Sequence, residues 1–308
     1  KSLIRVGTFE FAAHFGTRSD LESLTRYTMQ KLHPDLVFSP DGVHEFLSRT
    51  ATLQARLIGQ WMNIGFIHGV MNTDNMAISG ETIDYGPCAF MNVYRANTVF
   101  SSIDHAGRYA YGNQPAIAQW NLTRFAETLL PLLAPQQDEA IAVATEMLGQ
   151  FPSLFEKYWL DGMRAKLGLK TVESDDPALI KNLLGWMQQS GADFTNTFRD
   201  LSEADLPTGG HYEDSAFLDW HRKWSTRLGR ENRTVASALA DMSGVNPAYI
   251  PRNHRVEEAL AAAQDHNDLS VLYRLLAPLA TPYESRSEFA EYREPSPDGC
   301  GYRTFCGT

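Results

Sequence analysis

Apolar positions along the first part of the chain predict two α-helices. Apolar side chains recur at helical spacing over residues 20–32 and over residues 43–64, which places them on one face of a helix. Pro34 ends the first pattern, because proline has no backbone N–H with which to continue a helix. The second pattern is apolar on most sides and is typical of a long, largely buried helix.

Helical patterns also dominate the rest of the chain. They cover residues 115–133, 138–167, 177–189, 215–228, 235–242, 256–263 and 270–277. Pro115 and Pro177 fall in first turns, where proline is favoured, and Asp138 places a carboxylate at the positive end of a helix dipole. After Pro282 the chain is rich in Glu, Ser, Arg and Pro, and we expect it to follow the surface as far as Tyr302.

Only one segment gives a clear β signal. Residues 75–84 contain two short apolar runs around Ser79-Gly80-Glu81, the pattern of a small hairpin. Residues 85–113 show no periodicity and contain several Gly, Asn and Ser, which predicts a long irregular loop. A loop of that length in a compact domain is usually functional or disordered. The predicted fold class is mainly α with a small β-hairpin.

The composition is that of an acidic globular protein. The 308 residues are 43% hydrophobic and 21% charged, which is enough to bury a core in one or two compact units. Lys and Arg number 27 against 37 Asp and Glu, and the formal net charge of -10 repels a phosphate backbone. We therefore expect no nucleic acid partner. The apolar runs fall far short of the roughly 20 residues that cross a bilayer, so we expect no membrane partner.

The start of the chain and its cysteines bear on where the protein works. The chain begins at Lys1 without an initiator Met or a signal-peptide pattern, and we interpret Lys1 as a cut end. The cysteines are Cys88, Cys300 and Cys306, a sparse and odd set that argues against the disulfide framework of a secreted protein. A reducing compartment, the cytoplasm, fits best.

Candidate chemistry is concentrated in residues 68–75 and in Asp84-Tyr85-Gly86, on either side of the predicted hairpin. Kinase-type phosphoryl-transfer enzymes hold Mg²⁺ with a catalytic-loop Asn and with the Asp of an Asp-x-Gly motif. An amide oxygen and a carboxylate suit a hard cation that prefers oxygen ligands. Asn75 and Asp84 are therefore the candidate metal ligands.

The kinase pattern fails at the catalytic base. In His-Arg-Asp-x-x-x-x-Asn the Asp follows the His by two residues, and Val70 occupies that position here. Asp74 is the nearby carboxylate that could accept a hydroxyl proton or hold a second metal, or it could be a turn residue that caps the loop. We interpret His68 as a neutral imidazole that organises the turn. Arg5 has the simple interpretation of a solvated residue near a chain end.

Other nucleotide and hydrolase motifs are missing from the sequence. It contains neither Gly-x-x-x-x-Gly-Lys-Ser/Thr nor Gly-x-Gly-x-x-Gly, which excludes the P-loop and Rossmann phosphate cradles. It also lacks His-Glu-x-x-His, paired Cys-x-x-Cys and Gly-x-Ser-x-Gly, so neither a zinc site nor an α/β-hydrolase nucleophile is indicated.

The chain resembles the SelO family of protein adenylyltransferases. The resemblance is carried by His68-Gly-Val-Met-Asn-Thr-Asp-Asn-Met76, by Thr82-Ile-Asp-Tyr-Gly-Pro-Cys88 and by residues 107–122. It extends to Ile4-Arg-Val-Gly-Thr-Phe-Glu10, to residues 246–253 and to Thr304-Phe-Cys306, and thus covers essentially the whole chain.

The resemblance implies a protein-kinase-like fold in which a flipped ATP exposes its α-phosphate, so that AMP is transferred to Ser, Thr or Tyr of a protein. It implies that Asn75 and Asp84 bind Mg²⁺ or another divalent cation and that Asp74 is the base. Arg5 matches an Arg that binds the terminal phosphate of ATP. An Arg in that place would stabilise the pyrophosphate that leaves when the α-phosphorus is attacked.

The resemblance also implies a domain arrangement. Residues 1–285 correspond to a kinase-like C-lobe with additional C-terminal helices, and residues 286–308 to a C-terminal tail. The family's N-terminal lobe, with its nucleotide-contacting Lys and Glu, is expected upstream of Lys1, so we expect this chain alone to be inactive. The alternatives are a phosphotransferase that uses the same metal ligands and, because of Val70, a non-catalytic pseudokinase scaffold.

Redox control is a further implication of the resemblance. Family members carry selenocysteine or cysteine near the C-terminus, and its disulfide with an activation-loop cysteine is a proposed switch. By that resemblance Cys88 would pair with Cys306, while Cys300 is close enough in sequence to compete. The alternative is three unrelated reduced thiols.

Overall fold

Long helices make up most of the molecule. The computed structural model describes residues 2–296 and 301–305. Its helices are α1 (Val6–Phe15), α2 (Arg18–Leu32), α3 (Pro40–Asn63), α4 (Gln114–Leu133), α5 (Gln137–Lys166), α6 (Asp176–Ser190), α7 (Phe194–Asp200), α8 (Ser215–Leu228), α9 (Val235–Ser243), α10 (Asn253–His266) and α11 (Ser270–Ala280). Short 3₁₀ turns are η1 (Thr73–Asn75), η2 (Tyr111–Asn113), η3 (Gly210–Glu213) and η4 (Ser287–Tyr292). Within the described residues no helix has both the length and the apolar character needed to span a bilayer.

The helical predictions are confirmed for α2 to α6 and for α8 to α11, with shifted ends. The largest shift is in α10, predicted over 256–263 and observed as Asn253–His266. Two helices were missed. In α1 the buried residues are Val6 and Phe9, while Phe11 and Phe15 are exposed, so its apolar residues define no single face. The other, α7, has only seven residues, too few for a periodic pattern.

The sequence correctly predicts a small antiparallel β element, but its two strands lie outside residues 75–84. The two-stranded antiparallel sheet joins β1 (Phe66–Ile67) to β2 (Ala89–Phe90). Residues 75–84 form a tight turn with a single bridge, Met76 to Thr82. The hairpin is not extended because the backbone of the first run pairs instead with the entry to α1. The bonds run from Val6 N to Met76 O at 3.0 Å and from Ile78 N to Ile4 O at 2.9 Å.

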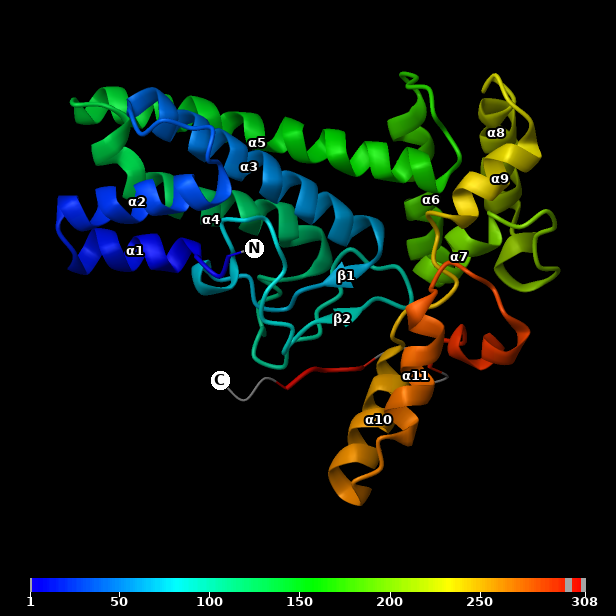
Figure 1. Cartoon of the computed structure of the whole chain (residues 1–308). Helices are drawn as coiled ribbons and strands as arrows, with labels where there is room; N and C mark the ends of the chain where they lie inside the picture. Colours follow the sequence, from blue (N-terminus) through cyan, green and yellow to red (C-terminus); the bar gives the residue numbers. More distant parts are fainter. Residues whose placement is uncertain (1, 297–300, 306–308) are drawn as a thin grey trace.

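The long helices pack into one half of the molecule. Helix α3 lies against α4 and α5, and α1 lies across α4 and α2 (Figure 1). Phe9, Phe46 and Phe125 bring α1, α3 and α4 together, and Phe125 meets Phe9 and Phe46 edge to face at 4.9 and 5.7 Å between ring centroids. Burial of three aromatic rings fixes α1 on the bundle, so the residues at its start have a fixed place.

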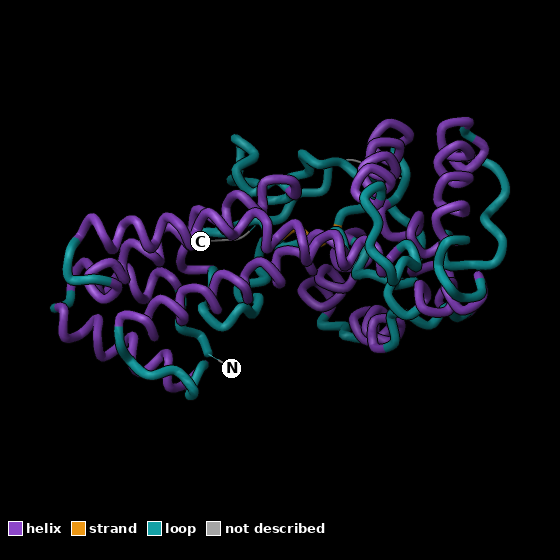
Figure 2. Tube along the Cα trace, turned by 90° about the horizontal axis from the view of Figure 1, so that it is seen from above, coloured by secondary structure: helices purple, strands orange, loops and turns teal. Residues whose placement is uncertain are grey.

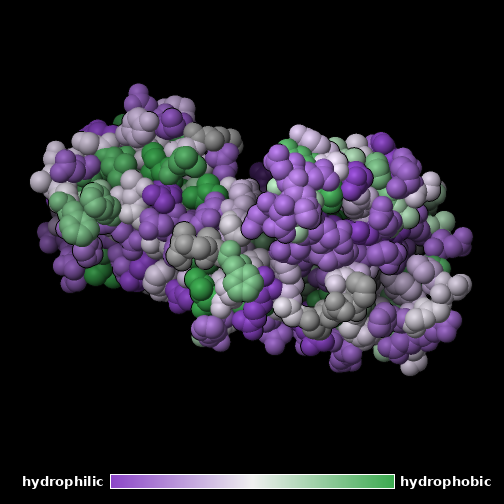
Figure 3. All heavy atoms as spheres, turned by 90° about the horizontal axis from the view of Figure 1, so that it is seen from below, coloured by the Kyte–Doolittle hydropathy of each residue, from purple (hydrophilic) through white to green (hydrophobic). Residues whose placement is uncertain are grey.

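Shorter helices form the other half. Figure 2 shows the long helices running lengthwise into a second group of shorter ones, in which α8 packs on α6, while α10 and α11 form a hairpin that projects to one side (Figure 1). The face seen in Figure 3 carries more apolar surface on the long-helix half and is mostly hydrophilic on the other. Leu3, Phe11 and Phe15 are among the exposed apolar side chains near α1.

A buried arginine anchors the irregular segment between β2 and α4. Arg252 is almost fully buried. It donates to Asn92 Oδ1 at 2.8 Å, to Asp193 Oδ2 at 2.7 Å and to Asn196 Oδ1 at 3.0 Å. It also donates to the carbonyl of Arg293 at 2.7 Å. One guanidinium thus ties the irregular segment to the start of α7 and to the chain after α11.

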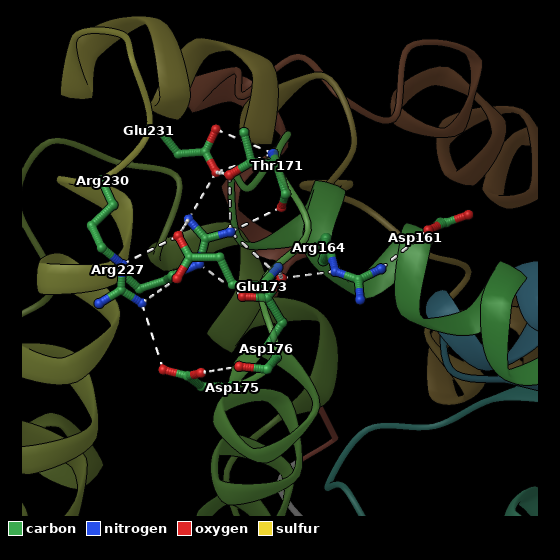
Figure 4. A network of polar contacts seen from close by, with 10 residues as sticks. Asp161, Arg164, Thr171, Glu173, Asp175, Asp176, Arg227, Arg230 and Glu231 are labelled. Atoms are coloured by element: carbon green, nitrogen blue, oxygen red, sulfur yellow. Dashed lines mark hydrogen bonds and ion pairs between the residues drawn. The ribbon is translucent and has the colours of Figure 1, made fainter.

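A second buried ionic network joins α5, α6 and α8 (Figure 4). Asp176 has no exposed surface and accepts hydrogen bonds from Arg227 Nε at 2.8 Å and from Arg164 Nε at 2.9 Å. Burial alone would raise the pKa of Asp176, but the bonds from Arg227, from the Glu173 amide and from Arg164 outweigh it and hold that pKa below its usual value. The carboxylate is therefore ionised and central to the packing of these helices.

Asp176→Asn should lower the free energy of unfolding by about 3 kcal/mol at neutral pH, because two buried guanidinium groups lose the charge of the buried carboxylate that they share and keep only their other acidic partners. Urea unfolding measures the change, with Asp219→Asn on the exposed face of α8 as the matched control. The contribution of Asp176 is complete above its unfolded pKa of about 4 and is lost as pH falls through its lower folded pKa. A difference between wild type and variant that does not shrink in acid would contradict this assignment.

Candidate active site

His68 organises the loop that follows β1. Its ring is fully buried against Trp61, with centroids 5.2 Å apart. Nε2 donates to the carbonyl of Ile83 at 2.8 Å, and Nδ1 accepts from Val70 N at 3.4 Å. Burial lowers the pKa of His68, and its hydrogen bonds and the charge of Asp84 offset this only in part. A neutral imidazole thus positions the backbone directly before Asp84, as interpreted from the sequence.

Two amide side chains of α4 support the same loop, and sequence reasoning missed both. Gln114 accepts from His68 N through Oε1 and donates to Phe66 O through Nε2, each at 3.0 Å. Asn121 donates to Met71 O at 2.9 Å. Both side chains are fully buried. The available signal was partial: Asn121 is a polar residue on the apolar face of the helix predicted over 115–133, where a buried amide must be hydrogen-bonded, while Gln114 stands directly before that range.

Three of the predicted site residues come together at the start of α1. Arg5 donates through one terminal nitrogen to the backbone oxygen of Asp74 at 3.2 Å, and the same nitrogen lies 3.8 Å from Asp74 Oδ1. Asn75 donates through Nδ2 to Val70 O at 3.0 Å. This bond orients the amide, and Asn75 Oδ1 accepts no hydrogen bond from any residue that the structure describes. Arg5 is thus a partner of the loop rather than a solvated end residue.

Asp84 has an uncommon backbone conformation. Its φ is 56°, in the left-handed region that costs a residue other than glycine about 1 kcal/mol or more. Its carboxylate is exposed, and among the described residues Oδ1 accepts a single long hydrogen bond, 3.4 Å from Gly86 N. Non-glycine residues in this region concentrate at functional sites, and Asp84 faces solvent with most of its ligand capacity free.

These donors fit a hard divalent cation. Asn75 offers an amide oxygen to which no described residue donates, and Asp84 offers an exposed carboxylate. Across residues 2–296 and 301–305, no three His, Cys, Asp or Glu side chains cluster as ligands for a metal ion. One or two protein oxygens completed by water and phosphate oxygens are the usual shell of Mg²⁺. The residues therefore suit a metal that arrives with a nucleotide better than a preformed all-protein site.

The C-terminal tail packs against the segment after Asp84. Thr304 is buried and pairs through its backbone with Phe100 O at 2.8 Å and with Ser102 N at 3.0 Å. Its hydroxyl donates to Pro87 O at 2.8 Å. Pro87 in turn lies against Gly69, where an added Cβ would be 2.6 Å from Pro87 O. The tail thus holds the segment after Asp84 against the loop that carries Asp74 and Asn75.

Cys88 follows Pro87 and is a partly buried free thiol. Burial raises the pKa of Cys88 to about 11. Cys300 and Cys306 lie outside the described residues, so the pairing of Cys88 with Cys306 stays a prediction.

Comparison with known proteins identifies the family. A family model described as "Protein adenylyltransferase SelO" matches residues 1–280. Proteins named "Protein nucleotidyltransferase YdiU" are 51% identical over 308 residues in Syntrophotalea carbinolica and 52% identical over 309 residues in Halalkalibacterium halodurans. The protein of that name in Nitrosococcus oceani is 49% identical over 308 residues. The chain therefore belongs to the SelO family. It is matched over 100% of its length and spans 63%, 63% and 62% of these relatives.

Cys88 should react slowly with iodoacetamide at pH 7. A thiol with a pKa of about 11 has on the order of 100-fold less thiolate than free glutathione, and the rate should rise as pH approaches that value. Peptide-resolved mass spectrometry of the timed reaction separates Cys88 from the other cysteines. The urea-unfolded chain is the control and should react at the glutathione rate. A glutathione-like rate in the folded protein would show that burial does not protect this thiol.

Proposed function

We propose that the full-length protein transfers AMP from ATP to hydroxyl side chains of proteins, and that this chain supplies the catalytic loop. The observation that supports the proposal is that His68 hydrogen-bonds both to Val70, in the loop that ends at Asn75, and to Ile83, directly before the left-handed, exposed Asp84. His68 connects the two segments. The names of the family and of the relatives, adenylyltransferase and nucleotidyltransferase, support the type of group transferred.

The proposed roles follow from the donors. Within a kinase-like C-lobe, Asn75 Oδ1 and the Asp84 carboxylate would hold Mg²⁺, which when bound neutralises phosphate charge and orients the nucleotide. Asp74, exposed beside Asn75, would accept the proton of the acceptor hydroxyl. Arg5, directly before α1, has a terminal nitrogen 3.8 Å from Asp74 Oδ1 and would contact the leaving pyrophosphate oxygens. Attack at the α-phosphorus breaks its bond to the bridging oxygen, and pyrophosphate carries away the electron pair.

The phosphotransferase and pseudokinase alternatives use the same loop. A pseudokinase was considered because Val70 replaces the usual catalytic Asp. In the structure Val70 contributes its carbonyl to Asn75 and its N–H to His68, so that position serves the loop through its backbone. The neighbouring Asp74 provides a carboxylate in its place, which favours an active enzyme.

We also propose that Cys88 pairs with Cys306 under oxidising conditions. The support is the hydrogen bond from Thr304 to Pro87, because these residues stand two before Cys306 and one before Cys88 in the sequence. A disulfide there would reinforce an existing contact between the tail and the segment that follows Asp84.

Asp84→Asn in the full-length protein should reduce AMP transfer by about 100-fold or more, because it removes the charged metal ligand. The assay supplies Mg²⁺ and ATP labelled at the α- or the γ-phosphorus and follows label on protein. Wild type should incorporate the α label alone, and Asp219→Asn should match it. Transfer of the γ label would establish a phosphotransferase. No transfer by the wild-type protein would indicate a non-catalytic scaffold. An active Asp84→Asn variant would show that another residue is the metal ligand.

Oxidation of the full-length protein by glutathione disulfide should produce a Cys88–Cys306 bond, found by peptide mapping without reduction. Cys306→Ser should remove the redox sensitivity of AMP transfer and leave the unfolding midpoint of the reduced protein unchanged, since a regulatory disulfide is more easily reduced than a structural one. Cys88 recovered as a free thiol, or bonded only to Cys300, would exclude this pairing.

A further inference from the structure

The start of α1 approaches the side chain of Asp74 more closely than any side chain at that position would allow. Gly7 is the second residue of α1. A Cβ added to Gly7 would lie 2.3 Å from Asp74 Oδ1 and 3.0 Å from Asp74 Cγ. Contacts under about 3 Å are not tolerated between such atoms, so an alanine here requires a movement.

The helix cannot easily supply that movement. Its entry is paired with the loop through Val6 N to Met76 O at 3.0 Å and Ile78 N to Ile4 O at 2.9 Å. Phe9, one turn further along, is fully buried among aromatic rings. The Asp74 side chain, in contrast, is 64% exposed and has solvent to move into. The Asp74 backbone can stay in place, because its Cα would lie 3.5 Å from the added Cβ, an ordinary contact.

Electrostatic interactions also favour the contact between the Asp74 carboxylate and Gly7. The first turn of α1 presents backbone N–H groups without partners in the helix, and the positive end of the helix dipole attracts a carboxylate. Arg5 adds a positive charge 3.8 Å from Asp74 Oδ1. Both favour a carboxylate that rests against Gly7 over one that points into solvent.

We propose that Gly7 is a positioning residue for Asp74: the missing side chain lets the carboxylate lie against the first turn of α1, in the place from which it takes the acceptor proton. The inference rests on the proposed function, in which Asp74 is the base. Gly7 has no positive φ that would require glycine for backbone reasons, so the space beside Asp74 is what excludes a larger residue.

The test is Gly7→Ala in the full-length protein. AMP transfer should lose at least 10-fold in kcat with an unchanged KM for ATP, since general base catalysis contributes about 100- to 10,000-fold and a displaced base loses part of that contribution. The urea midpoint should stay the same or rise, because alanine favours a helix over glycine. Gly149→Ala and Gly185→Ala are matched controls, as both glycines are helical and nothing lies within 4 Å of their added Cβ.

Asp74→Asn and the double variant Gly7→Ala/Asp74→Asn separate this inference from the proposed function. If Gly7 acts through Asp74, the double variant should be no slower than Asp74→Asn alone. Full activity of Asp74→Asn would overturn the base assignment itself. An inactive Asp74→Asn together with a Gly7→Ala that behaves like the two controls would overturn only the role of Gly7. A Gly7→Ala that raises KM for ATP or lowers the urea midpoint would also overturn it, because the effect would then be structural.

Discussion

The candidate site depends on hydrogen bonds to the backbone of a loop that has almost no regular structure. Residues 68–75 contain only the short turn η1, so their buried polar groups need partners from elsewhere. Gln114 and Asn121 of α4 provide partners from the core, and the ring of His68, within the loop itself, accepts from Val70 N and donates to Ile83 O. Because the three side chains are buried, each unpaired group would cost about 1–3 kcal/mol, which holds the loop in a single arrangement.

The same loop is held from two further sides by segments that are distant in sequence. The entry to α1 pairs with residues 76–78, which brings Arg5 and Gly7 to Asp74. The tail reaches Pro87 through Thr304 and thereby fixes the segment after Asp84. Movement of α1 or of the tail would therefore change the positions of Asp74 and of the segment after Asp84. This gives a physical route by which a change at the tail can reach the turn that carries Asp84, a candidate metal ligand.

Much of the helical architecture could be predicted from the sequence, and Asn75 and Asp84 could be nominated as candidate metal ligands. Helices α3 and α5 are long and periodic, and their pattern is local information. Asn75 and Asp84 were recognised from motif order, and the structure leaves the oxygens of both available. The predicted hairpin over 75–84 was misplaced because Ala77 pairs with Arg5, far away in the sequence. A local pattern of apolar residues cannot predict that pairing.

The sequence by itself determined most of the helical segments, with α1 and α7 as exceptions, where the oxygen donors lie along the chain and which family the chain resembles. Each of these follows from neighbouring residues, because helix periodicity and motif spacing are short-range properties. Only the tertiary structure decided that Gly7 faces Asp74, that Gln114 supports His68 and that Thr304 reaches Pro87. These contacts join residues 67, 46 and 217 positions apart, and a contact across such a separation leaves no periodic signal in the chain.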